Sequence, residues 1–303
     1  FQSIRGLDLE SRAADLQGSL ASRESYPDWL HQRATQELGE SWPTLAQALN
    51  LPAPLTIRVN TLKIQPRELQ KKLQEEEIFT RTLDWAPQAL VLEKRVNMFR
   101  KESFNQGWYE IQDAGSQMIA PFLQVKPGQR VIDACAGAGG KTLHLAALME
   151  NKGSLIAMDR DKRKLDELKR RTKRNGVHNV EIRPIESTKT VKRLGQSADR
   201  LLLDVPCSGT GVIKRNPDTK WKLLPEHIER TQKLQQEILE NYSSMLKSGG
   251  MLVYATCSIL PSENEEQIRS FLKNHSSFEL VEERRLDPTA KSDGFYLALL
   301  RKN

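Results

Sequence analysis

The spacing of apolar side chains is helical in the first part of the chain. Apolar residues recur three or four positions apart around Tyr26 and Leu30, and again at Leu45 and Leu49. This period matches one face of an amphipathic helix and shows no strand-like alternation. The pattern predicts a helical segment over residues 1–51.

Residues 52–105 have a mixed pattern that indicates a small α+β domain. Apolar and polar residues alternate over 55–60, as in a half-buried strand. A helical period follows over 67–77, and a second apolar run lies at 89–92. This order predicts a βαβ-like unit.

Strand-like and helical patterns alternate over residues 106–303, which is typical of a parallel α/β sheet. Helical patterns fit between the first five pairs of strands, whereas the last two strands follow each other directly and predict an antiparallel hairpin. Seven strands with this ending resemble the methyltransferase variant of the Rossmann-like fold. The strands are predicted at 130–134, 154–159, 180–185, 200–205, 251–257, 278–282 and 295–301.

A glycine-rich turn, DACAGAGGKT, follows the first of these strands at 133–142. A P-loop would need glycine where Cys135 stands, and a GxGxxG fingerprint would need glycine where Thr142 stands. S-adenosylmethionine needs close backbone approach at such a turn and a carboxylate for its ribose at the end of the next strand. Asp159 stands there, 20 residues after Gly139. The turn and the acid together predict an S-adenosylmethionine site.

Two cysteines follow the fourth and fifth of these strands. Cys207 comes shortly after Asp204, and Cys257 ends the next strand. Ligands bind beyond the carboxyl ends of the strands in an open parallel sheet, so we expect both thiols to face the cofactor turn. A thiolate beside a methyl donor suits methylation of a pyrimidine, because its attack on C6 makes C5 nucleophilic while Asp204 shares a proton with N3. The residues leave open which thiol attacks.

Charge and composition narrow the class of protein. The chain has 46 basic and 39 acidic residues, and nine basic against three acidic residues fall within 160–174. That run predicts contact with an acidic partner such as RNA or, as the plainer alternative, a solvated helix. The three cysteines form no CxxC pair, which excludes a disulfide framework, argues against a metal site and favours a reducing, cytoplasmic location.

The ends and the hydropathy of the chain give two further expectations. No apolar run reaches the roughly 18 residues of a membrane span, so we expect no membrane association. The chain begins with Phe, so we expect its native start to lie upstream.

Motif-like stretches occur along most of the chain. They are SYPDWL (25–30), PLTIRVNTLKI (54–64), WYEIQDAGSQ (108–117), DACAGAGGKT (133–142), DVPCSGTG (204–211), RNPDTKW (215–221), ATCSILPSENEEQI (255–268) and DGFYLALLRK (293–302). Together they resemble the RNA cytosine-C5 methyltransferases of the Sun/Nop2 type, which include bacterial ribosomal-RNA enzymes. The likeness covers about residues 25–303, and two cysteine motifs at this spacing make it specific.

The resemblance implies a role for each matching position of the active site. Cys257 would be the nucleophile, and Cys207 would help to release the product. Asp204 and Lys141 would hold the cytosine, and Asp159 the ribose of S-adenosylmethionine. The residues expected to contact this cofactor are Cys135, Ala136, Gly137, Ala138, Gly139, Gly140, Lys141, Asp159, Arg160, Glu186 and Asp204.

The resemblance also places the RNA. Arg215, Asn216 and Asp218 would line the RNA side of the site, with a capped surface loop as the alternative. The small domain at 52–105 would correspond to an RNA-recognition-like domain.

This chain departs from the family pattern at three places. Ala138 stands where the turn usually has proline, and we expect the site to remain intact because the glycines are present. Glu186 stands where the family tends to carry the Asp that binds the adenine, and a longer acid can still accept from the amino group. Residues 1–24 lack the helical RNA-binding domain of some longer bacterial members.

The sequence therefore predicts an S-adenosylmethionine-dependent RNA cytosine-C5 methyltransferase that acts on ribosomal RNA as a monomer. The same reaction on transfer RNA is one alternative, and a catalytically idle RNA-binding or assembly factor is another. Asp204, Cys207 and Cys257 are all present, which argues against an idle factor. A DNA methyltransferase would have no evident use for Cys257.

Overall fold

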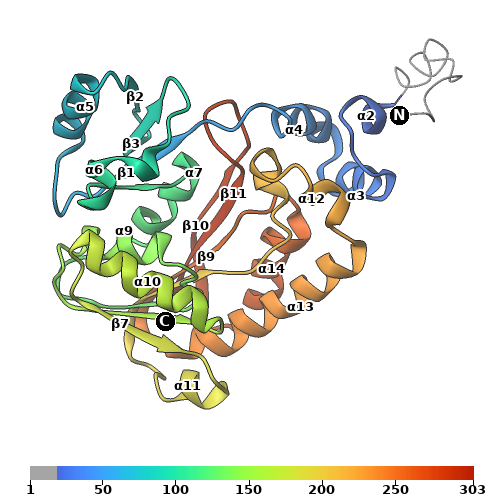
Figure 1. The fold of residues 1–303 in the computed structure, drawn as a ribbon. Helices are drawn as coiled ribbons and strands as arrows, with labels where there is room; N and C mark the ends of the chain where they lie inside the picture. The colour runs from blue at the N-terminus through green and yellow to red at the C-terminus, as the bar shows by residue number, and fades with distance from the viewer. Residues whose placement is uncertain (1–18) are drawn as a thin grey trace, which may run out of the picture.

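Three short helices precede the first sheet in the computed structural model, which describes residues 19–303 (Figure 1). They are α2 (Leu20–Arg23), α3 (Asp28–Leu38) and α4 (Trp42–Ala48). The helical prediction for 1–51 is thus confirmed from residue 20, and its part over 1–18 lies outside the described residues. No helix within 19–303 is long and apolar enough to cross a membrane.

The N-terminal helices pack on the loops of the second half of the chain. Tyr26 and Trp42 meet edge to face with ring centroids 4.9 Å apart. Their buried cluster includes Ile213 and Ile259, which follow the fourth and fifth strands of the large sheet. Aromatic pairs of this kind and the burial of large side chains stabilise the contact.

The small domain is a four-stranded antiparallel sheet with one helix. Its elements are β1 (Thr56–Val59), α5 (Pro66–Glu75), β2 (Thr80–Leu83), β3 (Ala86–Leu92) and β4 (Tyr109–Ile111), and the strand order is β2-β3-β1-β4. The predicted βαβ-like unit needs correction, because β1 and β3 pair antiparallel, with Thr56 opposite Val91. The hairpin partner β2 reverses the chain between α5 and β3, and β4 lies beyond residue 105.

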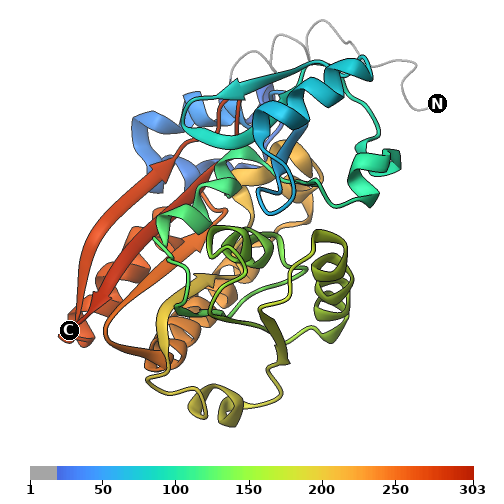
Figure 2. The ribbon, with the colours of Figure 1, turned by 90° about the vertical axis from the view of Figure 1, so that its left-hand side faces the viewer.

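Both faces of this small sheet are covered (Figure 2). Leu69 and Leu73 of α5 are fully buried against one face. On the opposite face, Ala89 and Val91 pack with Ala114 of α7 (Ala114–Gln117). The sheet is therefore docked on the rest of the chain and does not present an open face to a ligand.

The large sheet has seven strands in the order β10-β11-β9-β8-β5-β6-β7. The five strands from β5 to β9 are parallel, whereas β11 is antiparallel to both β9 and β10, as the sequence predicts. The strands are β5 (Arg130–Asp133), β6 (Ser154–Asp159), β7 (Val180–Pro184), β8 (Ala198–Asp204), β9 (Leu246–Thr256), β10 (Phe278–Leu286) and β11 (Phe295–Lys302).

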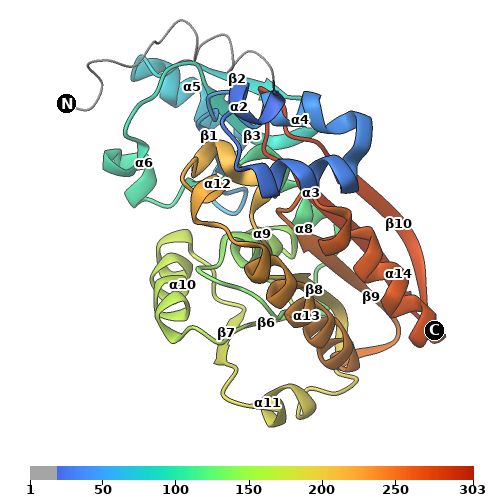
Figure 3. The same cartoon turned by 90° about the vertical axis from the view of Figure 1, so that its right-hand side faces the viewer.

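Helices cover both faces of the large sheet (Figure 3). On one face lie α8 (Ile119–Phe122), α9 (Gly140–Leu148) and α10 (Lys162–Asn175). On the other lie α11 (Thr188–Lys192), α13 (Pro225–Tyr242) and α14 (Glu265–Asn274). The short helices α6 (Glu102–Asn105) and α12 (Thr219–Lys222) lie outside these layers.

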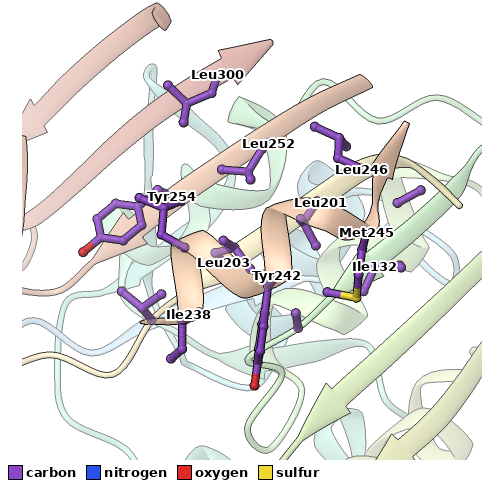
Figure 4. Close-up of a cluster of buried hydrophobic side chains, with 14 of the residues drawn as sticks. Ile132, Leu201, Leu203, Ile238, Tyr242, Met245, Leu246, Leu252, Tyr254 and Leu300 are labelled. Atoms are coloured by element: carbon purple, nitrogen blue, oxygen red, sulfur yellow. The ribbon is translucent and has the colours of Figure 1, made fainter. Parts of the chain in front are cut away.

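Burial on both faces of the large sheet explains why its strands are continuous apolar runs in the sequence. Successive residues of a strand point to opposite faces, and each face is covered by helices. Leu201 and Leu203 of β8 lie on the side of Ile238 and Tyr242 (Figure 4), whereas Leu202 belongs to the cluster on the other face. All three leucines are completely buried, so the sheet is fixed rigidly at the strand ends where the site lies.

Candidate active site

The two predicted strand-end cysteines lie in contact. β8 and β9 are parallel neighbours, with Asp204 beside Ala255, so the loops that follow them meet at one edge of the sheet. The Sγ atoms of Cys207 and Cys257 are 3.2 Å apart. The backbone N–H of Cys257 also donates to the sulfur of Cys207, at 3.3 Å. Both thiols are reduced and partly buried.

A cavity of about 420 Å³ opens over these thiols. Lys141 from the first turn of α9 and Asp204 from the end of β8 line it together with both cysteines. Arg215 lies at its edge. The structure thus brings the four predicted catalytic side chains into one space of a size that suits a small ligand or a single base.

Lys141 and Asp204 form an ion pair inside this cavity. Lys141 Nζ is 2.7 Å from Asp204 Oδ2, and both side chains are about four-fifths buried. Burial alone would lower the pKa of Lys141, but the charge of Asp204 and their hydrogen bond outweigh burial and raise the pKa. The charge of Cys257 acts in the same direction, so the ammonium group lies near that thiol.

The thiols of Cys207 and Cys135 are held in their neutral form. The hydrogen bond to Cys257, and then burial, raise the pKa of the Cys207 thiol well above its usual range. Burial, and then the charge of Asp133, raise the pKa of Cys135. Cys135 packs against the apolar core behind the glycine-rich turn.

A buried carboxylate supports the loop that carries Cys207. Glu263 is completely buried and accepts from the backbone N–H of Ser208 at 2.8 Å and from the Ser208 hydroxyl at 2.5 Å. Gln235 of α13 donates to the same carboxylate at 3.1 Å. These bonds join the two cysteine loops, because Ser208 follows one thiol and Glu263 belongs to the segment that follows the other.

Arg215 is held by two buried aspartates at the rim of the cavity. Its guanidinium donates to Asp113 at 2.7 Å and to Asp293. Burial, and then the charge of Asp113, raise the pKa of Asp293 to about 6, although Arg215 opposes the shift. The predicted RNA-side residue Arg215 is therefore fixed in place by segments about 100 residues before it and 78 after it.

The glycine-rich turn adopts a backbone conformation that favours glycine, as the sequence suggests. Gly139 adopts φ +89° at the start of α9, and a Cβ there would lie 2.1 Å from Leu168 Cδ1. Asp159, at the end of β6, accepts from the backbone N–H of Gly137 at 2.8 Å and from that of Asp161 at 2.8 Å. The carboxylate is thus fixed beside the turn, where an anionic or hydroxyl-bearing ligand can approach bare N–H groups.

Two arginines tie the turn to the small domain. Arg58 of β1 is buried and donates to the carbonyl of Gly140 at 2.5 Å. Burial lowers the pKa of Arg58 to about 9. Arg171 of α10 donates to the carbonyl of Ala138 at 2.7 Å and to Glu110 of β4 at 2.9 Å.

The basic run over 160–174 contains both paired and exposed side chains. Arg171 and Arg174 both bind the buried Glu110, at 2.9 and 2.5 Å, so part of the run holds the small domain in place. Other basic residues of α10, among them Lys169 and Arg170, are exposed. The run is therefore only partly open to a partner.

The predicted adenine and RNA-side residues line two further hollows. Arg160 and Glu186 line a cavity of about 650 Å³ beside α13, and Glu186 also pairs with Lys162 at 3.0 Å. Asn216 and Asp218 line a hollow of about 620 Å³ that includes Arg215. No group of three or more His, Cys, Asp or Glu side chains suited to a metal ion occurs within residues 19–303.

Four acidic residues of the site were not assigned from the sequence. Asp113, Asp133, Glu263 and Asp293 all lie in stretches that carry the family resemblance. Asp133 is completely buried; one of its oxygens accepts from Thr142 at 2.7 Å, and the other has no hydrogen-bond partner. The motifs include these residues, but the roles of the residues depend on partners that are distant in the sequence.

Comparison with known proteins agrees with this geometry. Residues 120–301 match the family model "16S rRNA methyltransferase RsmB/F", and residues 26–99 match the ferredoxin-like domain of RsmF/B-like methyltransferases. The chain is 33% identical over 302 residues to a probable ribosomal RNA small subunit methyltransferase B from Coxiella burnetii, covering 94% of this chain and 70% of that protein.

Two more relatives extend the comparison. A protein of the same printed name from Synechocystis is 37% identical over 263 residues, covering 86% of this chain and 59% of the relative. The crystal structure of a methyltransferase homologue from Pyrococcus horikoshii superposes with a TM-score of 0.83 at 33% identity, covering 94% of this chain and 98% of that one. The chain thus spans between 59% and 70% of the length of these two bacterial relatives.

Proposed function

Because the chain belongs to the RsmB/F family of S-adenosylmethionine-dependent 16S rRNA methyltransferases, we propose that it methylates C5 of a cytosine in ribosomal RNA through a covalent adduct with Cys257. One observation carries the proposal. The Cys207 and Cys257 sulfurs, 3.2 Å apart, share one cavity with the Lys141–Asp204 ion pair. Two thiols beside a charged pair suit nucleophilic catalysis on a pyrimidine.

The residues around the glycine-rich turn fit S-adenosylmethionine. Asp159 is fixed by two backbone N–H groups and would accept from the ribose hydroxyls. Arg160 and Glu186 line the neighbouring cavity, where Glu186 would accept from the adenine amino group. When bound, S-adenosylmethionine supplies an electrophilic methyl group.

Cys257 is the better candidate for the nucleophile. The Lys141 ammonium lies near Cys257, whereas the pKa of Cys207 is raised well above its usual range. The thiolate is the reactive form of a cysteine, so a thiol with a raised pKa is the poorer nucleophile. The Cys257 thiolate would add to C6 of the cytosine while Asp204, bound to Lys141, shares a proton with N3.

Release of the product requires the reverse electron flow. Once C5 carries the methyl group, a base removes the C5 proton, the C5–C6 double bond re-forms, and the Cys257 sulfur leaves as a thiolate. Cys207 would assist this step, because its hydrogen bond to Cys257 stabilises the departing sulfur.

The target RNA would contact the segment that follows Cys207. Arg215, Asn216 and Asp218 would face the RNA around the target base. We expect the protein to act as a monomer. A ribosomal RNA substrate supports a cytoplasmic location.

The test combines labelled S-adenosylmethionine, a mixture of unmodified 16S rRNA and transfer RNA, and three cysteine variants. We expect Cys257→Ala to form neither 5-methylcytidine nor an adduct. Cys207→Ala should accumulate a covalent protein–RNA adduct on a denaturing gel, and the double variant should lose that adduct.

Two results would contradict the proposal. An adduct that survives in Cys257→Ala would move the nucleophile to Cys207. Methylation of transfer RNA in place of 16S rRNA, mapped in the same experiment, would remove the ribosomal target but keep the chemistry.

A further inference from the structure

Three hollows meet at Arg215. One is the catalytic cavity, and the second is the α12 hollow of about 620 Å³, which Asn216 and Lys222 also line. The third is the Phe99 hollow, about 480 Å³, whose walls include Phe99 and Arg95. Arg215 lines all three, so a chain whose base occupies the catalytic cavity would enter the other two on either side.

An exposed aromatic ring accompanies each flanking hollow. Phe99 lines its hollow and is 61% exposed. Trp221 belongs to α12, whose residues Thr219 and Lys222 line the other hollow, and it is 62% exposed. These are the two most exposed large apolar side chains of residues 19–303. Single exposed apolar residues are common on protein surfaces, but two rings beside one catalytic cavity indicate a binding surface.

Neighbouring side chains hold the Phe99 ring in position. The Asn97 side chain accepts from the backbone N–H of Phe99 at 3.2 Å and caps this turn. The ring of Phe104 meets Phe99 edge to face at a centroid distance of 5.2 Å. Arg174 in turn lies 3.9 Å from the centre of the Phe104 ring. A ring that is braced by its neighbours and mostly exposed is suited to stacking.

The charge of the segment around Phe99 favours a polyanion, because Lys94, Arg95 and Arg100 are exposed. Residues 94–101 contain four basic and no acidic side chains. Residues 214–222 also contain four basic side chains, but Lys214 and Lys220 are buried, and Arg215 and Lys222 pair with aspartates. Figure 1 shows that the small domain, which carries the first segment, and α12, in the second, flank the strand ends that hold the catalytic cavity. Basic grooves with interspersed aromatic side chains are typical of proteins that bind single-stranded nucleic acid.

We propose that Phe99 and Trp221 stack on the nucleotides that flank the target cytosine, one on each side, and that the site therefore takes unpaired RNA. The inference rests on the proposed function, since it presumes that the catalytic cavity holds a cytosine. A flanking base can lie on a protein ring only when it has left its neighbours in a helix, so a duplex must open before it binds here.

Binding is measured with the Cys257→Ala protein, so that no adduct forms. The probe is a nine-nucleotide single-stranded RNA with a central cytidine, and the same strand annealed to its complement is the second probe. Phe99→Ala and Trp221→Ala are made in this background. The matched controls are Phe79→Ala and Trp85→Ala, which remove rings that are 52% and 39% exposed and belong to none of the segments that line the three hollows.

We expect each stacking variant to weaken binding of the single strand by about ten-fold, because one base–aromatic stack contributes roughly 1–3 kcal/mol. The control variants should bind within about two-fold of the parent, and Phe99→Tyr and Trp221→Phe, which keep a ring, should also retain binding. The parent should bind the duplex more weakly than the single strand.

The inference is overturned if Phe99→Ala and Trp221→Ala bind like the two controls, or if the duplex binds as tightly as the single strand. Loss of binding that the ring-keeping variants fail to restore would likewise overturn it, since stacking would not be the cause. The adduct experiment on 16S rRNA with intact Cys257 is independent of these readings, so a failed stacking surface and a failed function are distinguishable.

Discussion

Replacement of Asp133 by asparagine should change how the stability of the protein depends on pH. Asp133 is completely buried at the end of β5, and burial raises the pKa of its carboxyl from 3.8 to about 7. Thr142 opposes the shift, whereas the nearby charge of Asp204 reinforces it. A carboxyl with a raised pKa holds its proton longer in the folded chain than in the unfolded one. The folded state is therefore favoured at low pH, and stability falls as the pH rises from about 4 to about 7.

The size of the effect follows from the pKa of Asp133 in the folded and in the unfolded chain. A pKa that differs by one between the two states corresponds to about 1.4 kcal/mol, so the full change over the titration range is about 4 kcal/mol. Roughly 3 kcal/mol of it falls between pH 5 and pH 8, because part of the loss has already occurred at pH 5. Asp133→Asn removes this titration. Any cost of burying the amide in place of the carboxyl is constant with pH and leaves the slope unaffected.

The assay is denaturant unfolding of both proteins at pH 5, 6, 7 and 8. The difference in unfolding free energy, variant minus wild type, should rise by about 3 kcal/mol from the lowest to the highest pH. Asp199→Asn is the matched control. Burial acts against it, but the hydrogen bond to Lys247 lowers the pKa of Asp199, so its contribution is lost only on acidification below about pH 4 and stays flat over this range. Parallel curves for wild type and Asp133→Asn would refute the reasoning.

Two further substitutions, one of them with a matched control, test the supports of the site. Gly139→Ala places a Cβ 2.1 Å from Leu168 at φ +89°, so it should destabilise the protein by about 2–5 kcal/mol in the same unfolding assay. Gly137→Ala, with no atom within 4 Å of its Cβ, should cost only about 1–2 kcal/mol, and equal losses would contradict the packing argument. Glu263→Gln weakens the charged hydrogen bonds to Ser208, so single-turnover methylation should slow by about ten-fold while cofactor affinity, measured by calorimetry, stays unchanged. A fall in cofactor affinity instead would show that Glu263 acts on the cofactor turn and not on the Cys207 loop.

The large sheet was predictable from the sequence because its signal is local. Strands that are buried on both faces are continuous apolar runs, and the helices between them have a clear period. The small sheet was only half predictable. β2 (Thr80–Leu83) is short and polar with two exposed positions, and β4 (Tyr109–Ile111) has only three residues, so neither shows a recognisable alternation.

The residues of the site were also only partly predictable from the sequence. Cys207, Cys257 and Asp204 could be placed together because parallel strands end at one edge of a sheet, whatever their separation in the sequence. The partners of Arg215 could not, since Asp113 lies 102 residues away in a loop that only the tertiary fold brings near. For the same reason, the sequence could not show that Arg171 and Arg174 of the basic run turn inward to Glu110.

The contacts of the N-terminal helices indicate that a minimal enzyme must include these helices. Glu37 of α3 accepts from the backbone N–H of Ser262 at 3.0 Å, and the ammonium of Lys220 binds the carbonyl of Glu24 at 2.9 Å. The helices α2–α4 thus contact the segments that follow the two thiols in the chain. A fragment cut at the family boundary near residue 120 would keep the two thiols and the Lys141–Asp204 pair but lose the helices that contact the neighbouring loops. The unit that folds around the cavity therefore includes segments that lie far apart in the sequence. A chimaera of two such proteins has to exchange the N-terminal helices together with the loops that they contact.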